Sequence, residues 1–149
     1  MNNTPVLPPA YLFASLSAMV LLHFLVPVYQ LTAYPWNAIG LLPLITGAGL
    51  NLAADAALKK QGTTVKPYET PSALITTGVY SLSRNPMYLG MSLILIGVAL
   101  LMGSLTPYTI VPGFIIIIDR AFIRPEEVTL NRQFGEAWTA YVEGVRRWL

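Results

Sequence analysis

The 149-residue sequence contains no cysteine and few charged residues. Without thiols, the chain forms no disulfide bonds and no thiolate metal sites. Only 11% of its residues are charged, well below the roughly one quarter that is usual in soluble domains. Residues 1–54 include no Asp, Glu, Lys or Arg at all. Because a compact soluble domain needs charge on every side, the sequence predicts an integral membrane protein.

The charges that are present fall into two blocks, residues 55–84 and 119–147. Both blocks border long apolar segments, so the small net charge of +2 reflects residues beside membrane segments. It gives no indication of binding to nucleic acid. We therefore expect the lipid bilayer as a partner, and no nucleic acid.

Four apolar segments are long enough to cross a bilayer as helices, and they cover about residues 11–31, 36–57, 86–102 and 105–122. The first has neither a basic leader nor a convincing cleavage site, which favours an uncleaved transmembrane helix that Pro27 kinks. The predicted fold class is an all-α integral membrane protein, with one domain over residues 1–149. It has four transmembrane helices, a cytosolic loop and a C-terminal interfacial helical segment over residues 124–149.

The basic residues indicate the orientation of these helices. All nine Lys and Arg residues lie in the loop after the second segment or after Ile118, and the connections at the opposite ends carry none. Basic residues next to membrane spans stay in the cytosol. We therefore expect both termini to be cytosolic, in a bacterial inner membrane.

A few polar or small residues interrupt the first two segments. His23 is either a hydrogen-bonded packing residue or a site residue. Asn51 and Asp55 lie one helical turn apart, and they either make local hydrogen bonds or line a polar cavity. Gly49 and Ala53 form a pair of small residues that would let another helix approach closely.

The loop over residues 59–85 has no helical period but carries several apolar residues. Long irregular connections tend to be functional, and we expect this one to fold over the cytosolic face as a lid. At its end, Asn85 is a good N-cap and Pro86 suits the first position of a helix. Arg84 therefore lies beside a helix N-terminus, which favours the binding of anions.

The tail, residues 124–149, has its own helical pattern. Pro125 is expected to open a new helix, with Glu126 and Glu127 in the first turn. Apolar residues recur at three- and four-residue spacing, which favours a helix on the cytosolic membrane face; they are Leu130, Phe134, Trp138, Tyr141 and Val145. Gly135 and Gly144 divide this segment into short pieces.

Two motifs follow one another in the second half of the chain. The first is Thr77-Gly78-Val79-Tyr80 followed by Ser83-Arg84-Asn85-Pro86-Met87-Tyr88-Leu89-Gly90. The second is Arg124-Pro125-Glu126-Glu127 followed by Leu130, Phe134-Gly135-Glu136, Tyr141 and Arg146. Together they resemble the signatures of the isoprenylcysteine carboxyl methyltransferase family and its phospholipid N-methyltransferase relatives.

The resemblance implies an S-adenosylmethionine-dependent methyltransferase in the membrane, with a lipophilic or lipid-anchored methyl acceptor that enters from the bilayer. It implies catalytic roles for Arg84 and Glu127 and no metal. The implied cofactor-binding residues are Gly78, Tyr80, Asn85, Pro86, Tyr88, Gly90, Glu126 and Glu127. Position 85 departs from the family, because the best-known members have histidine there; an asparagine can cap a helix but cannot carry a proton near neutral pH.

The chemistry of these residues suits that reaction. Carboxylates can bind the ammonium and ribose hydroxyls of S-adenosylmethionine, and Arg84 can hold a carboxylate in bidentate fashion. We expect Glu127 to matter more than Glu126, which is closer to the helix start and to solvent. In the simpler interpretation, both acids only favour a helix start and Arg84 is a topological anchor.

Carboxylate O-methylation and amine N-methylation both stay open, and the sequence predicts no oligomeric state. Two other functions are compatible with parts of the pattern. One is a membrane oxidoreductase of the sterol-reductase type, and the other is a small transporter or scaffold without catalysis.

Overall fold

The computed structural model describes residues 7–62 and 71–149. Within these ranges most of the backbone is helical, with one isolated bridge between Gln30 and Ser104 and no β-strand. The α-helices are α1 (Pro8–Leu25), α2 (Leu41–Lys60), α3 (Pro86–Met102), α4 (Ile110–Ile118), α5 (Arg124–Phe134) and α6 (Glu136–Gly144). Short 3₁₀ helices are η1 (Trp36–Gly40), η2 (Gly78–Ser81) and η3 (Thr106–Thr109), and η4 (Asp119–Ile123) is a π-helix.

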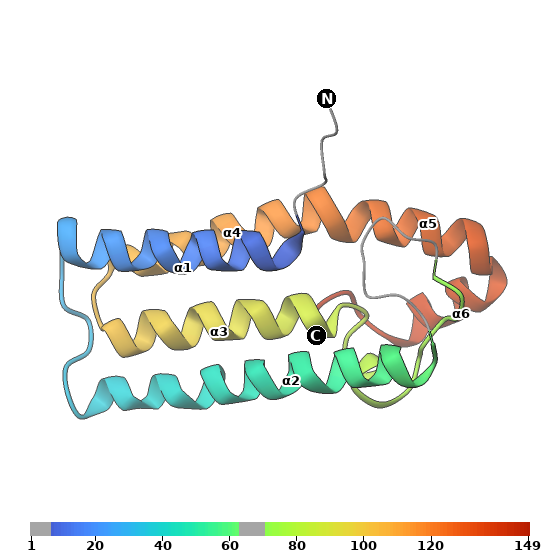
Figure 1. Cartoon of the computed structure of the whole chain (residues 1–149), viewed down its shortest axis with the longest axis horizontal. Coiled ribbons are helices and arrows are strands. Elements are labelled where there is room, and N and C mark those ends of the chain that lie inside the picture. Colours follow the sequence, from blue (N-terminus) through green and yellow to red (C-terminus); the bar gives the residue numbers. More distant parts are fainter. Residues whose placement is uncertain (1–6, 63–70) are drawn as a thin grey trace.

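The long helices run side by side in a bundle (Figure 1). Helices α1 and α4 cover one side of α3, and α2 covers the other side. Helix α5 continues the line of α4 beyond the bundle, α6 turns back, and the C-terminus returns to the start of α3. The charged end of the molecule is therefore built by α3, α5, α6 and the last residues of the chain.

The apolar core lies where α1, α3 and α4 meet, with Met19, Leu95 and Ile118 fully buried. The outward faces of α1 and α2 expose large apolar side chains such as Phe13 and Leu42, as a lipid-facing surface would. Pro8–Leu25, Trp36–Lys60 and Thr106–Phe134 are long and apolar enough to cross a membrane, and Pro86–Met102 is a shorter apolar helix. The predicted all-α membrane fold is therefore confirmed, while the count of four spans and their orientation stay predictions.

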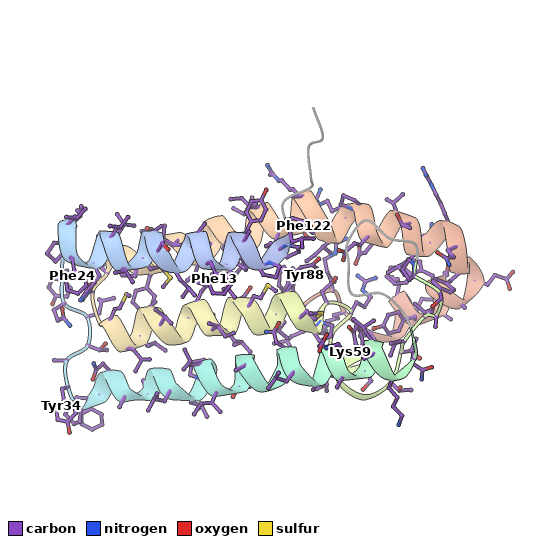
Figure 2. All side chains as sticks on the ribbon, viewed as in Figure 1. Phe13, Phe24, Tyr34, Lys59, Tyr88 and Phe122 are labelled. Carbon is purple, nitrogen blue, oxygen red and sulfur yellow. The ribbon has the colours of Figure 1, made fainter. Side chains whose placement is uncertain are left out.

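The two ends of the bundle differ in chemistry. In Figure 2, Phe24 and Tyr34 lie at one end, whereas Lys59 lies at the end that carries α5 and α6. Arg84 and Arg147 also belong to this second end, where they meet Glu127 of α5. This separation is the one expected when basic residues stay on one side of a bilayer.

Helices α2 and α3 approach so closely that glycine is needed at the contact. A Cβ atom at Gly97 would lie 2.7 Å from the carbonyl oxygen of Gly40, and one at Gly90 would lie 2.2 Å from the side-chain nitrogen of Asn51. Gly49 has no neighbour within 4 Å of its would-be Cβ. The expectation that Gly49 mediates helix packing is therefore wrong within the described residues, because Gly47 makes the close approach to α3.

Two predicted boundaries differ from the structure. Helix α1 ends at Leu25, so Pro27 lies outside it and does not kink it. A proline makes helical geometry unfavourable for the residue before it, here Val26. Helix α4 continues through η4 into α5, so Pro125 does not open a new helix. The interfacial position of residues 124–149 stays a prediction. The π-helix ends at Ile123, two residues before Pro125, and its wider turn accommodates the missing N–H of the proline. The predicted break at Gly135 is confirmed, with φ of 49°.

The polar residues of the first two segments have local partners. His23 Nδ1 lies 2.6 Å from the hydroxyl of Ser104, the amide of Asn51 donates to the carbonyl of Gly47, and Asp55 pairs with Lys59 at 2.6 Å. In the part of the chain that the structure describes, the main cavity is not lined by His23, Asn51 or Asp55. His23 and Asn51 are hydrogen-bonded within the helix bundle, whereas Asp55 forms a partly exposed ion pair with Lys59.

The predicted lid is only partly described. Residues 63–70 lie outside the described residues. Beyond them, the side chain of Gln133 donates a hydrogen bond to the carbonyl of Pro71, and Ile75 is buried. Residues 71–75 therefore pack against the α5–α6 end.

We expect Gly97→Ala to destabilise the protein. The added methyl group would force α2 and α3 apart, at a cost of about 1–3 kcal/mol. Gly113→Ala is the matched control, because no atom lies within 4 Å of a Cβ at Gly113 in α4. Thermal unfolding in detergent measures both variants, and equal melting temperatures for them would contradict the glycine contact.

Candidate functional site

The start of α3 is joined to the end of the chain. Asn85 stands at the N-cap position, but its side chain makes no capping hydrogen bond. Its Nδ2 donates instead to the carbonyl of Arg147 at 3.1 Å, and the hydroxyl of Ser83 donates to the same oxygen at 3.1 Å. The predicted capping role of Asn85 is thus wrong, because its amide has a partner in the C-terminal residues.

The last five residues, 145–149, leave α6 in extended geometry at Val145, and we call them the C-terminal strap. The backbone N–H of Arg84 donates to the carbonyl of Arg146 at 3.0 Å. Trp148 packs against the apolar core. The strap is therefore anchored both by hydrogen bonds to residues 83–85 and by burial of an aromatic ring.

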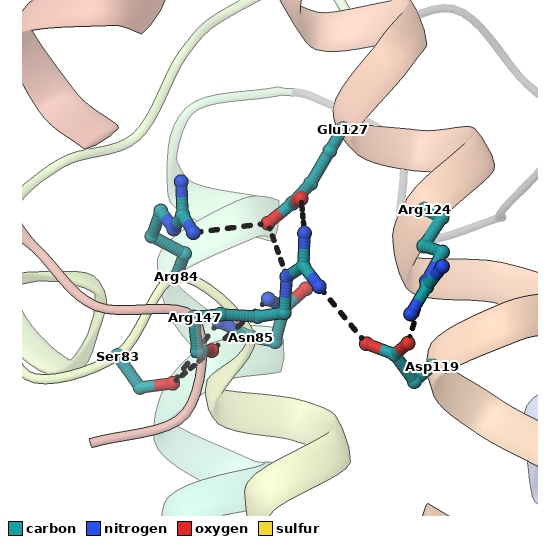
Figure 3. A network of polar contacts seen from close by, with 7 residues as sticks. All are labelled: Ser83, Arg84, Asn85, Asp119, Arg124, Glu127 and Arg147. Carbon is teal, nitrogen blue, oxygen red and sulfur yellow. Dashed lines mark hydrogen bonds and ion pairs between the residues drawn. The ribbon is translucent and has the colours of Figure 1, made fainter. Parts of the chain in front are cut away.

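A chain of ion pairs surrounds this contact (Figure 3). Glu127 accepts from Arg147 Nε at 3.2 Å and from Arg147 Nη2 at 2.5 Å. Arg84 Nη2 lies 3.4 Å from the same carboxylate. Asp119 of η4 accepts from Arg147 at 3.2 Å and from Arg124 at 2.7 Å. Two carboxylates and three guanidinium groups thus join α5, the strap and the start of α3.

Arg84 is the least satisfied member of this network. Its side chain is only 11% exposed, and its guanidinium lies 5.7 Å from the centre of the Trp138 ring. Its Nε is buried without a hydrogen-bond partner among the described residues. Because buried donors are normally paired, the unpaired Nε makes Arg84 a candidate for binding an anionic group.

A cavity of about 600 Å³ opens beside Arg84, between the start of α1, residues 71–75, the start of α3 and the α5–α6 pair. Its volume is in the range of ligand sites. Its polar wall includes Tyr80, Arg84, Asn85, Tyr88, Glu126, Thr129 and Tyr141. Its apolar wall includes Leu7, Pro8, Met87, Met91, Phe122 and Pro125. The cavity therefore offers polar groups on one side and an apolar surface on the other.

Glu126 supplies the carboxylate of this wall. The hydroxyl of Tyr88 donates to Glu126 Oε1 at 2.6 Å. Glu126 follows the apolar part of the long helix. Burial raises the pKa of Tyr141 to about 12. Tyr141 therefore stays protonated, and its hydroxyl donates to the carbonyl of Tyr80 at 2.6 Å.

The structure brings together six of the residues predicted from the sequence: Tyr80, Arg84, Asn85, Pro86, Tyr88 and Glu126 all line the cavity. Glu127 does not line it and lies with Arg147 in a separate groove between α5 and α6. Gly90 faces α2. Gly78 has φ of 64°, a conformation that favours glycine, and open space at its would-be Cβ. The roles of all these residues stay predictions.

Sequence reasoning did not assign Arg147, Asp119 and Trp138 to the site. Trp138 belongs to the apolar stripe of the tail and is indeed buried, but the stripe does not show that an arginine packs on its ring. In the sequence, Arg147 is only one of several charged residues of the second block, residues 119–147. Its partners Ser83 and Asn85 lie more than 60 residues earlier, so no local pattern could have revealed the contact.

The described residues contain no group of three or more His, Cys, Asp or Glu side chains that could hold a metal ion. The residues that line the cavity supply one guanidinium, one carboxylate, one amide, the hydroxyls of three tyrosines and one threonine, and one indole N–H. Such a set suits an organic ligand that carries both charges.

Residues 36–137 match the family model described as phospholipid methyltransferase. The chain belongs to this family. The match spans α2 to the first residues of α6 and includes the cavity residues of α3 and α5. Membership confirms the resemblance seen in the sequence and indicates a methyltransferase embedded in a membrane.

A relative adds no further function. An uncharacterized protein of Haemophilus influenzae is 38% identical over 63 residues, which are 42% of this chain and 100% of that protein. No solved structure matches the chain.

We expect Asn85→Ala to loosen the strap. The change removes one of the two side-chain donors to the Arg147 carbonyl, a loss of about 1 kcal/mol. The backbone N–H of Arg84, which bonds to the neighbouring Arg146 carbonyl, should then exchange faster with deuterium. Asn131→Ala, an exposed change on α5, is the control, and unchanged exchange in Asn85→Ala would contradict the contact.

Proposed function

We propose that this protein transfers a methyl group from S-adenosylmethionine to a lipophilic acceptor at the cytosolic face of the membrane. One observation carries the proposal: the residues that line a single cavity include both Arg84, whose buried Nε has no hydrogen-bond partner among the described residues, and the carboxylate residue Glu126. The family to which the chain belongs supports the methyl transfer.

The residues of the cavity fit S-adenosylmethionine. This molecule carries a carboxylate, an ammonium group and ribose hydroxyls. The buried guanidinium of Arg84 would hold the carboxylate through a charge-assisted hydrogen bond. Glu126 would hold the ammonium group or the hydroxyls, because its Oε1 is fixed by Tyr88.

S-adenosylmethionine supplies a methyl group bound to a positively charged sulfur, which makes that carbon open to in-line attack. The protein's contribution is to orient the reactants and exclude water. The aromatic rings of Tyr80, Tyr88 and Trp138 line the cavity, and such faces attract a cationic centre.

The apolar wall suits the lipophilic part of the acceptor. Met87, Met91 and Phe122 form a surface between α3 and the end of the fourth apolar segment. These residues sit at the border between the apolar and charged parts of the chain, so a lipid chain would extend toward the bilayer core. Its head group would then face Arg84 and Glu126.

We propose an amine as the methylated group of that acceptor. Arg84 is the single cationic side chain of the cavity wall in the described part of the chain. If Arg84 holds the cofactor's carboxylate, the described cavity wall offers no second cation to hold an acceptor carboxylate. O-methylation of a carboxylate is therefore the less favoured alternative.

We expect Glu126→Gln to weaken S-adenosylmethionine binding tenfold or more, about 1.4 kcal/mol. Glutamine keeps the shape and an acceptor oxygen, so the loss reports the charge. Glu127→Gln is the matched comparison, and we expect a smaller loss because Glu127 lies outside the cavity. This order reverses the one expected from the sequence. Calorimetric titration measures both variants, and unchanged affinity in both would refute a cofactor role for the acidic pair.

We expect the methylated product to resist mild alkali. Incubation of the purified protein with a lipid extract and tritium-labelled S-adenosylmethionine should give lipid-soluble radioactivity. An N-methyl group survives alkali, whereas a methyl ester releases volatile methanol. The same incubation with the Arg84→Ala variant gives the background level of lipid-soluble radioactivity. Release of the label as methanol would instead identify a carboxylate acceptor.

A further inference from the structure

Glu127 is shared unequally between two arginines. Arg147 contacts both of its carboxylate oxygens, at 3.2 and 2.5 Å, through two nitrogens. Arg84 reaches one oxygen, at 3.4 Å. The two-nitrogen geometry is the stronger form of this interaction, so Arg147 satisfies most of the carboxylate (Figure 3).

Arg84 is therefore only weakly paired with Glu127. The Glu127 side chain is only 14% exposed, and a carboxylate in such a place requires a cation. If Arg147 were absent, Arg84 would be the nearest remaining cation among its described partners. Glu127 would then pair fully with Arg84 and neutralise the guanidinium that faces the cavity.

We propose that Arg147 is a positioning residue for the ligand site. By occupying Glu127, it keeps the guanidinium of Arg84 available for the carboxylate of S-adenosylmethionine. The inference rests on the function proposed above, because it takes that molecule as the ligand.

The side chain of Arg147 can be tested apart from the docking of the strap. The hydrogen bonds from Ser83 and Asn85 go to the backbone carbonyl of Arg147, which any substitution retains. Trp148 anchors the strap independently. A change of the Arg147 side chain therefore removes its hold on Glu127 and Asp119 while the backbone contacts remain.

The test is a set of calorimetric titrations with S-adenosylmethionine. Arg147→Ala should bind it at least tenfold more weakly than the wild type. Arg147→Ala combined with Glu127→Gln should recover most of that loss, because no carboxylate is left to neutralise Arg84. A purely structural role predicts that the double variant binds as weakly as Arg147→Ala, or more weakly.

Two single variants calibrate the comparison. Arg132→Ala removes an exposed positive charge of α5 and should bind like the wild type. Arg147→Lys keeps the charge but offers a single ammonium in place of the planar fork, so it should give an intermediate affinity. Thermal unfolding of each variant checks that it is folded.

The outcomes separate this inference from the proposed function. If the wild type does not bind S-adenosylmethionine, the proposed function fails and this inference fails with it. If the wild type binds but Arg147→Ala binds equally well, the inference alone is wrong. Equal binding by Arg84→Ala and the wild type would also overturn it, because Arg84 would then not hold the ligand.

Discussion

The carboxylate of Glu127 holds the charged end of this protein together. A carboxylate that is only 14% exposed must be paired, and its partners come from two distant parts of the chain. Arg84 stands just before α3, and Arg147 stands two residues from the C-terminus. These ion pairs connect the long helix that carries Glu127 to the start of α3 and to the strap. The cavity lies beside them.

The continuous helix from residue 106 to 134 decides which acid faces the cavity. Adjacent residues of a helix point about 100° apart, so Glu126 and Glu127 lie on different sides of α5. The π-helix η4 inserts a wide turn just before them and thereby sets their rotation relative to the apolar part of the helix. As a result, Glu126 bonds to Tyr88 in the cavity, while Glu127 bonds to the two arginines.

Much of this organisation could be predicted from the sequence. The bounds of α3, Pro86–Met102, agree with the prediction, because a proline favours the first helical position and Gly103 takes the positive φ of 73° that ends the helix. The one-sided charges and the two motifs predicted a membrane methyltransferase, and the family match agrees. Most residues of the cavity's polar wall come from those motifs.

The remaining features depend on contacts between distant residues. The strap is held by backbone carbonyls, which leave no trace in the side-chain pattern. Pro125 favours the start of a new helix in the sequence pattern, whereas in the structure the π-helix η4 joins α4 to α5. The choice between Glu126 and Glu127 needs the rotation of that helix, which only the packed structure provides.

The central claim is that the cofactor binds in the cavity between α3 and the α5–α6 pair. Ultraviolet crosslinking of labelled S-adenosylmethionine, followed by mapping of the labelled peptides, tests it most directly. We expect label in peptides that contain Tyr80 to Tyr88 or Glu126 to Tyr141, and excess unlabelled S-adenosylmethionine should suppress it. Label confined to the opposite end of the bundle, near Tyr34 and Ser104, would contradict the account.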